Sequence, residues 1–371
     1  MAKLVYISKY PPLEGGIAAK TFWLSLALGR RGHHIHVVTD RKDVDKVHTL
    51  TTTTSIPNHA NVAIYRPLQR VPWHIPHDEH RTPTLLDKAL EVIEREKPDL
   101  IEAGYLVPYG LVAYLASKIT GLPYVLQHGG SDIKKFVEGG LWPNLWREVL
   151  SSAECVITDA NHRAEFERWN ARSRLILPYV PDPAVFRPVI REKRERPVLS
   201  LIGKANYHWE HKGWHRVIDI WSKMGEDFEF MVVSQGIGLE RFQAHARERL
   251  GNRVSWRPFL PPWEIPSLLQ SMDALFCFEA DLPFPMFSNL FVEALFCGTP
   301  VISDREDVIS RYRNYGLNLS RWHQLVLWVG KDDPIQAAER IKNLVFAHAN
   351  PTDLQVPGVY QRYISAHEGV F

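Results

Sequence analysis

The stretch PPLEGGIAAKTFWLSLALGRRGHHIHVVTD, residues 11–40, decides the fold. It ends in an apolar strand pattern, HIHVVTD (34–40), and a helix-length run separates this pattern from the earlier strand pattern LVYIS (4–8). Gly15 and Gly16 open that helix directly after a strand. Glycine permits close backbone approach there, and the helix N-terminus offers N–H groups that suit a diphosphate. The spacing is not G-x-G-x-x-G, so the dinucleotide fingerprint is absent, and a plain tight turn explains the pair equally well.

The alternation of strand and helix patterns continues along the whole chain. In the first half the predicted strands are 4–8, 34–40, 62–67, 99–105, 123–129, 155–160 and 174–180, with helices near 17–31, 84–97, 108–120, 142–153 and 161–170. In the second half they are 198–204, 228–234, 254–260, 274–280 and 299–304, with helices near 213–224, 239–250, 264–272, 289–297 and 333–348. Strands apolar on both faces, each followed by a helix, indicate parallel sheets covered on both sides. The sequence therefore predicts an α/β fold of two Rossmann-like doubly wound domains that face each other across a cleft, the default ligand site.

A change of composition gives the domain boundaries. Residues 181–197 (PDPAVFRPVIREKRERP) contain four prolines and a charge cluster, which is typical of a linker. We therefore expect one Rossmann-like domain over 1–180 and another over 198–350. The tail 351–371 ends in YQRYISAHEGVF, and we expect it to pack back on the first domain as a helix.

Composition argues against several classes of protein. Of the 371 residues, 45% are hydrophobic and 23% are charged, which excludes disorder, collagen and coiled coil for the chain as a whole. The 44 basic and 42 acidic residues leave a formal net charge of +2, which argues against nucleic acid as a partner. Cys155, Cys277 and Cys297 are scattered in apolar runs and fit buried thiols. Neither a secretion signal nor a membrane-spanning window is found, so we expect a cytoplasmic protein.

Two short segments of the second half carry groups that can bind an anion. Lys204 ends the strand SLIGK and Lys212 begins the next helix at HKGW, so both can reach one pyrophosphate from the carboxyl edge of a sheet. Ser288 can cap a helix whose first turn presents N–H groups, and Glu293 on that helix can accept hydrogen bonds from a ribose diol. On spacing alone, solvated lysines and a half-exposed glutamate remain alternatives.

In combination, these motifs resemble the family-four nucleotide-sugar glycosyltransferases of the GT-B fold, over nearly all of the chain. Segment 15–38, with its glycine pair and RGH, is similar to the first βαβ unit of that family. Segment 175–188 (LILPYVPDPAVFRP) is similar to its domain-crossing segment, although Tyr179 and Val180 replace the usual Asn-Gly pair. GK…HKGW resembles the phosphate-binding region, with Lys204 where arginine is commoner. SNLFVEALFCGTPVI is the most specific match.

The resemblance implies a retaining, metal-independent glycosyltransferase that uses a nucleoside-diphosphate sugar and a hydroxyl acceptor, such as a glycan, a glycolipid or a small glycoside. Lys204 and Lys212 would neutralise the pyrophosphate leaving group, and His128 in LQHGGSD would contact the donor sugar. A structural histidine at a strand end is the alternative for His128. The predicted donor-binding residues are Gly15, Gly16, Phe287, Ser288, Asn289, Leu290 and Glu293. A phosphate oxygen can take the acceptor proton, so neither a side-chain base nor a cofactor is expected.

One position departs from the family's motif. In that family a first glutamate, which usually meets the donor hexose, stands eight residues before the second. Here the residue eight positions before Glu293 is Pro285. Glu279 and Asp281 lie just upstream and are candidate substitutes. The departure leaves two alternatives open: a catalytically weak or silent nucleotide-sugar-binding subunit, or a nucleotide-sugar epimerase or hydrolase on the same architecture.

The acceptor is expected on the N-terminal domain. Its loop VPWHIPHDEHR (71–81) carries aromatic and imidazole groups at Trp73, His74, His77 and His80. The spacing of the histidines is compatible with a zinc site, but the prolines of this loop disfavour the helix that would align the imidazole rings. We predict instead that Trp73 and His77 bind the acceptor. Asp43 and Asp45 also look like a metal-binding pair, but they lie among basic residues and are interpreted as a solvated charge run.

Trp142 and Trp146 lie four residues apart in a predicted helix. Trp142 is the third predicted acceptor-binding residue, since an indole ring can stack on a sugar. Two alternatives remain, which are packing of the rings in the core and peripheral contact with a membrane interface.

Overall fold

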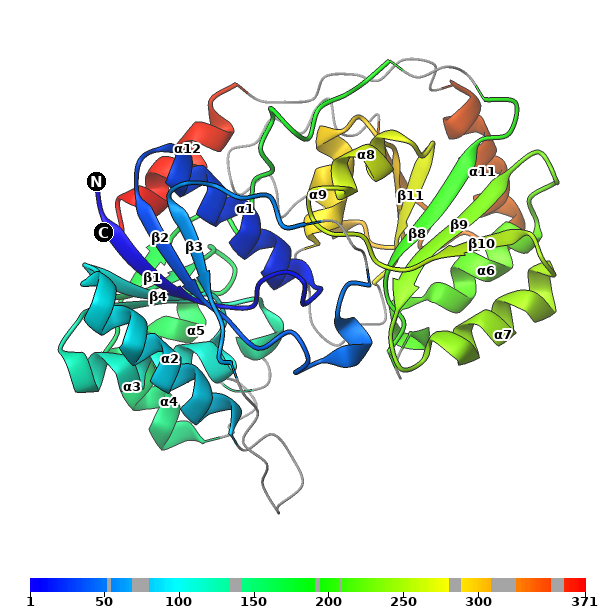
Figure 1. The fold of residues 1–371 in the computed structure, drawn as a ribbon. Coiled ribbons are helices and arrows are strands. Elements are labelled where there is room, and N and C mark those ends of the chain that lie inside the picture. Colours follow the sequence, from blue (N-terminus) through cyan, green and yellow to red (C-terminus); the bar gives the residue numbers. More distant parts are fainter. Residues whose placement is uncertain are drawn as a thin grey trace. The chain divides into compact units, whose positions relative to one another are not determined.

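The computed structural model describes residues 1–51, 55–68, 80–133, 136, 142–190, 194–206, 209–279, 288–307, 325–347 and 357–371. The chain divides into two compact units (Figure 1). Unit 1 comprises Met1–Thr49, Thr54–Val180 and Gln361–Phe371, and unit 2 comprises Leu50–Thr53 and Pro181–Tyr360. The segment interpreted as a linker therefore falls within unit 2.

Unit 1 is built on a seven-stranded sheet in the order β3-β2-β1-β4-β5-β6-β7, in which every neighbouring pair is parallel. The strands are β1 (Lys3–Ile7), β2 (His34–Val38), β3 (Val62–Tyr65), β4 (Leu100–Ala103), β5 (Tyr124–Gln127), β6 (Cys155–Thr158) and β7 (Ser173–Leu175). Every residue of β4 and β5 is buried, because helices cover both faces of the sheet.

Helices surround the sheet of unit 1, with α1 and α12 on one side and α2, α3 and α4 on the other (Figure 1). Their bounds are α1 (Gly16–Arg30), η1 (Lys46–His48), α2 (Arg81–Glu96), η2 (Leu106–Gly110), α3 (Leu111–Thr120), α4 (Pro143–Ser151), α5 (Arg163–Glu167) and α12 (Val359–Glu368). Ala89, Val112 and Trp146 have no exposed surface and join α2, α3 and α4 to one core.

The C-terminal helix α12 is fastened to unit 1 by polar contacts. Arg31, which follows α1, donates to Ser365 Oγ at 3.0 Å and forms an ion pair with Glu368. His33 Nε2 lies 3.2 Å from Glu368 Oε1, and the His33 ring meets Phe371 edge-on. The end of the chain is therefore part of the first unit.

Unit 2 has a six-stranded parallel sheet in the order β10-β9-β8-β11-β12-β13. Its strands are β8 (Val198–Lys204), β9 (Glu229–Gln235), β10 (Val254–Arg257), β11 (Ala274–Cys277), β12 (Val301–Ser303) and β13 (Val326–Trp328). Its helices are η4 (Glu210–Lys212), α6 (Trp214–Ser222), α7 (Leu239–Leu250), α8 (Ile265–Gln270), α9 (Asn289–Phe296) and α11 (Pro334–Ala347). The predicted fold class, two doubly wound α/β domains, is confirmed.

The order of the strands locates the functional edge of each sheet. In unit 1 the chain order reverses between β1 and β4, and in unit 2 it reverses between β8 and β11. Ligands of doubly wound sheets bind outside the carboxyl ends of the strands at this reversal. Gly16 begins the helix that follows β1, and Lys204 is the last residue of β8. Both sequence-predicted positions therefore lie at the reversal points.

Candidate functional site

The structure brings the two predicted lysines of unit 2 together at the end of β8. Lys212 Nζ donates a hydrogen bond to the main-chain oxygen of Lys204 at 3.0 Å, and both residues are half-buried. Lys212 Nζ also lies 5.1 Å from the ring centroid of Trp214, within the range of a cation–π contact. Gly203 lets this strand end approach Trp214 closely, because a Cβ at Gly203 would lie 2.9 Å from that ring.

Asp304, which follows β12, fastens the neighbouring loops and was missed by the sequence reasoning. Its side chain has no exposed surface, and Oδ1 accepts a hydrogen bond from the Glu279 N–H at 2.8 Å. Its Oδ2 lies 3.9 Å from Arg216 Nη1. Gly213, the N-cap of α6, has a positive φ of 71°, and a Cβ there would meet Asp304 Oδ2 at 3.2 Å. Asp304 thus positions both the candidate acid Glu279 and the start of α6. An acidic residue directly after the apolar run of VISD was the available signal.

Helix α9 begins as predicted. Ser288 Oγ accepts a hydrogen bond from the Phe291 N–H at 3.4 Å, which confirms the predicted cap. Asn289 and Leu290 form the first turn, where the positive end of the helix dipole lies. Glu293 is only 4% exposed, so it is not the half-exposed glutamate of the alternative interpretation. Phe287, Asp281 and Pro285 lie outside the described residues.

In unit 1, α1 begins at Gly16 without a capping side chain, because its N-cap is Gly15. Gly15 has a φ of 138°, which favours glycine, and its main-chain oxygen accepts from the Ala19 N–H at 3.0 Å. This helix start at the carboxyl end of β1 is suited to an anion.

His128 follows β5, and both of its ring nitrogens have protein partners. Nδ1 accepts from the Gly130 N–H at 3.3 Å, so Nε2 carries the proton and donates to Thr158 Oγ1 at 2.8 Å. Burial, together with the nearby His162, lowers the pKa of His128 to about 3. The ring is therefore neutral at physiological pH, and a sugar hydroxyl has to replace one of these two bonds to reach a ring nitrogen.

Asp132, within the predicted LQHGGSD motif, holds the turn that carries His128. Its carboxylate accepts hydrogen bonds from the N–H groups of Leu106, Gly129 and Ile133, at 3.1, 3.0 and 3.2 Å. Burial raises the pKa of Asp132 to about 6 although these bonds oppose the shift. Asp132 therefore joins the turn after β5 to the start of η2.

A second charged group, the buried Glu102 with the half-buried Lys20, was also missed by the sequence reasoning. Glu102 on β4 is 1% exposed and accepts a hydrogen bond from Gln127 Nε2. Burial raises the pKa of Glu102 to about 7. Burial lowers the pKa of Lys20 on α1 to about 8, although the charges of Glu102, Asp132 and Asp159 oppose the shift. The available signal was a charged residue inside a strand that is apolar on both faces.

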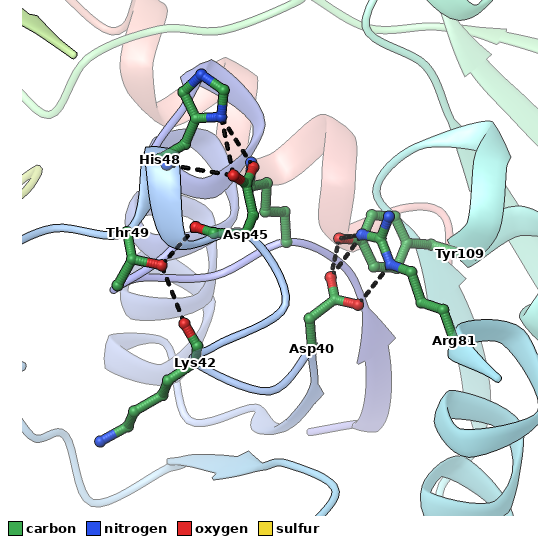
Figure 2. Close-up of polar contacts among 8 residues, drawn as sticks. Asp40, Lys42, Asp45, His48, Thr49, Arg81 and Tyr109 are labelled. Carbon is green, nitrogen blue, oxygen red and sulfur yellow. Dashed lines mark hydrogen bonds and ion pairs between the residues drawn. The ribbon is translucent and has the colours of Figure 1, made fainter. Parts of the chain in front are cut away.

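The loop after β2 contains ion pairs (Figure 2). Arg81 at the start of α2 donates to Asp40 through Nε at 2.7 Å and through Nη2 at 2.8 Å, and the Tyr109 hydroxyl donates to the same carboxylate. Asp45 contacts His48, and Asp43 pairs with Arg41. These pairs agree with the interpretation of Asp43 and Asp45 as part of a charge run.

The predicted acceptor residues are only partly described. Trp73, His74 and His77 lie outside the described residues, and His80 is the N-cap of α2. Trp142 is 56% exposed and stacks on Phe136, with 6.0 Å between the ring centroids. Trp146 is fully buried, so core packing is the correct interpretation for this second tryptophan.

Comparisons with known proteins agree with this arrangement. A family model described as "Glycosyl transferase 4-like domain" matches residues 15–179, and one described as "Glycosyl transferases group 1" matches residues 196–345. The N-acetyl-alpha-D-glucosaminyl L-malate synthase of Bacillus anthracis is 22% identical over 337 residues, which are 84% of this chain and 81% of that protein. In the part of the chain that the structure describes, no helix combines the length and the apolar character needed to cross a membrane.

Solved structures share the fold over the whole chain. Sucrose-phosphate synthase from Thermosynechococcus elongatus has a TM-score of 0.69 at 17% identity and covers 100% of this chain and 95% of its own. Anabaena HepE in complex with UDP-glucose has a TM-score of 0.64 at 18% identity, with 100% of both chains covered. The two family models together match most of the sequence. The chain therefore belongs to the GT-B glycosyltransferases of the family-four type.

Proposed function

We propose that this glycosyltransferase takes its sugar from a nucleoside-diphosphate sugar and transfers it to a hydroxyl acceptor with retention of the anomeric configuration. The observation that carries the proposal is the contact of Lys212 Nζ with the main-chain oxygen of Lys204, which brings both residues to the reversal point of the second sheet. Two ammonium groups there can stabilise the charge of a departing diphosphate. The HepE structure, which has the same fold, holds UDP-glucose, and this supports the donor class.

Helix α9 supplies the second part of the proposed donor site. It begins after β11 at the carboxyl edge of the same sheet, and its N-terminal end attracts the distal phosphate. Glu293 lies one turn into this helix and is nearly fully buried, so the hydroxyl groups of a ribose are suitable donors to its carboxylate.

The proposed reaction exchanges one bond at the anomeric carbon for another. The bond to the phosphate oxygen breaks, the acceptor oxygen bonds to the same face of the sugar, and the acceptor proton passes to the departing phosphate oxygen. Lys204 and Lys212 hold the diphosphate throughout, and the neutral His128 ring offers the sugar a hydrogen bond without adding charge. We propose that these ammonium groups and the α9 dipole replace a metal ion in this role.

The acceptor is assigned to unit 1. The exposed face of Trp142 can stack on a sugar ring or another flat apolar surface of an acceptor. This assignment rests on the described residue Trp142 and on the predicted loop 71–81.

The test combines binding with product analysis. The melting temperature of the full chain is measured with UDP, GDP and ADP and with their sugar conjugates, and a selective ligand should raise it by mass action. The selected donor is then incubated with hydroxyl acceptors, and NMR of the product should give the donor's anomeric configuration. An inverted product would contradict retention. If the only product were an epimerised or hydrolysed donor, the protein would be a nucleotide-sugar epimerase or hydrolase and not a transferase.

A further inference from the structure

The carboxyl ends of β5 and β6 gather a group of metal-ligating side chains in unit 1. His128, Asp159 and His162 each place one ligand atom within 4.8 Å of those of the other two. Within the described ranges, no other set of three histidine, cysteine or acidic side chains comes together in this way. We propose that His128, Asp159 and His162 bind a zinc ion.

The chemistry of the three ligands fits zinc. Two imidazoles and one carboxylate are typical zinc ligands, and three protein ligands leave a fourth position for water or another molecule.

The geometry needs only a small adjustment. Zinc–nitrogen bonds of about 2.0–2.1 Å require ligand atoms roughly 3.3 Å apart. His162 Nδ1 already lies 2.8 Å from Asp159 Oδ2, and the rings of His128 and His162 have centroids 5.2 Å apart. The His162 side chain is 21% exposed, which leaves it room to turn. Thr158 Oγ1 holds His128 Nε2 at 2.8 Å, the kind of outer contact that orients a metal-bound imidazole. The ion therefore takes Nδ1 and replaces the 3.3 Å hydrogen bond that this atom accepts from the Gly130 N–H.

The position of the site gives the ion a specific effect. His128 is the residue assigned to the donor sugar, so zinc and donor compete for one imidazole. The ion is then an inhibitor and not a cofactor of transfer. This consequence rests on the proposed function, whereas zinc binding itself does not.

The test is calorimetric titration of zinc chloride into the full chain, without a histidine tag and stripped of metal by a chelator. We expect one ion per chain, and at least tenfold weaker binding in His162→Ala and in Asp159→Asn, which keeps the shape of the side chain. The matched control is His48→Ala, because Asp45 and His48 have the same spacing and a contact of 3.0 Å (Figure 2) but lie in no described group of three. No stoichiometric zinc, or equal affinity in all variants, overturns the proposal.

Two further measurements separate this inference from the proposed function. Cobalt(II) should replace zinc and give the visible absorption of a tetrahedral site in the wild type but not in Asp159→Asn; no such difference would overturn the site. Titration of the same samples with UDP, GDP and ADP tests the nucleotide site in unit 2. Zinc binding without nucleotide binding would sustain the metal site and reject the donor assignment, and the reverse result would reject only the metal site.

Discussion

The two units differ in how they hold charge at the carboxyl edges of their sheets. In unit 2, Lys204 and Lys212 are half-buried at the strand end, where a ligand can meet them. In unit 1, Glu102 and Asp132 are 1% and 0% exposed. Glu102 accepts a hydrogen bond from Gln127, Asp132 accepts from main-chain N–H groups, and both interact with Lys20. Half-buried cations at a strand end can attract an anion, whereas fully buried polar groups with protein partners make the surrounding structure rigid. We infer that unit 2 binds the diphosphate and that unit 1 offers a rigid polar surface.

The largest effect is expected at the lysine pair. Lys212→Ala should lower the kcat/KM of transfer about a thousandfold, because it removes a charge that acts on the leaving group. Lys223→Ala, at the exposed C-cap of the adjacent helix α6, is the matched control and should change kcat/KM less than twofold, within about 0.4 kcal/mol. An equal loss of kcat/KM in both variants would contradict the assignment of the diphosphate to the lysine pair of unit 2.

The buried acid of unit 1 should affect stability instead. The pKa of Glu102 is about 7 in the folded chain and near 4.5 when unfolded, so its contribution to stability falls as pH rises from 4.5 to 7. Glu102→Gln stays neutral and should be more stable than the wild type by about 3 kcal/mol at pH 8, with little difference near pH 4.5. Urea unfolding at both pH values measures this. Glu94→Gln, exposed on α2, is the control, and the same pH dependence in both variants would contradict the account.

These two predictions differ in how far the sequence could anticipate them. The strand and helix alternation predicted both sheets, and the GK…HKGW spacing predicted the lysine pair, because these signals are local. The Lys20–Glu102 interaction joins α1 to β4 across the fold, so no local pattern reports it. In the sequence, only the isolated charge of Glu102 within an apolar strand indicated that this side chain has a charged partner.

The two tryptophans near α4 show a similar limit. The pattern placed both in one helix, but α4 begins at Pro143, which leaves Trp142 exposed before the helix and Trp146 in the core. Proline favours the first turn of a helix, so Pro143 was the signal for this boundary.

A smaller effect is expected at His128. His128→Ala should lower kcat/KM about thirtyfold, close to 2 kcal/mol, because one hydrogen bond to the sugar is lost. Affinity for the nucleoside diphosphate should change less than about twofold, since that ligand is assigned to unit 2. Calorimetry and steady-state kinetics of the same variant make the comparison. A parallel fall in kcat/KM and in nucleoside-diphosphate affinity would contradict the assignment of the sugar contact to unit 1 and of the diphosphate to unit 2.

The smallest effect is expected at Glu293. Glu293→Gln keeps the shape of the buried side chain and loses charge-assisted hydrogen bonding, so nucleoside-diphosphate affinity should fall about tenfold, or 1.4 kcal/mol. Glu339→Gln, exposed on α11, is the control. Unchanged affinity in Glu293→Gln would remove the ribose from this position.

Hydrogen–deuterium exchange of the full chain, with and without the nucleoside diphosphate that raises the melting temperature most, tests whether unit 2 binds the diphosphate. We expect slower exchange in the peptides that contain residues 203–214 and 288–293 of unit 2. Unchanged exchange in both peptides at saturating ligand would contradict the assignment of the diphosphate to the lysine pair and α9.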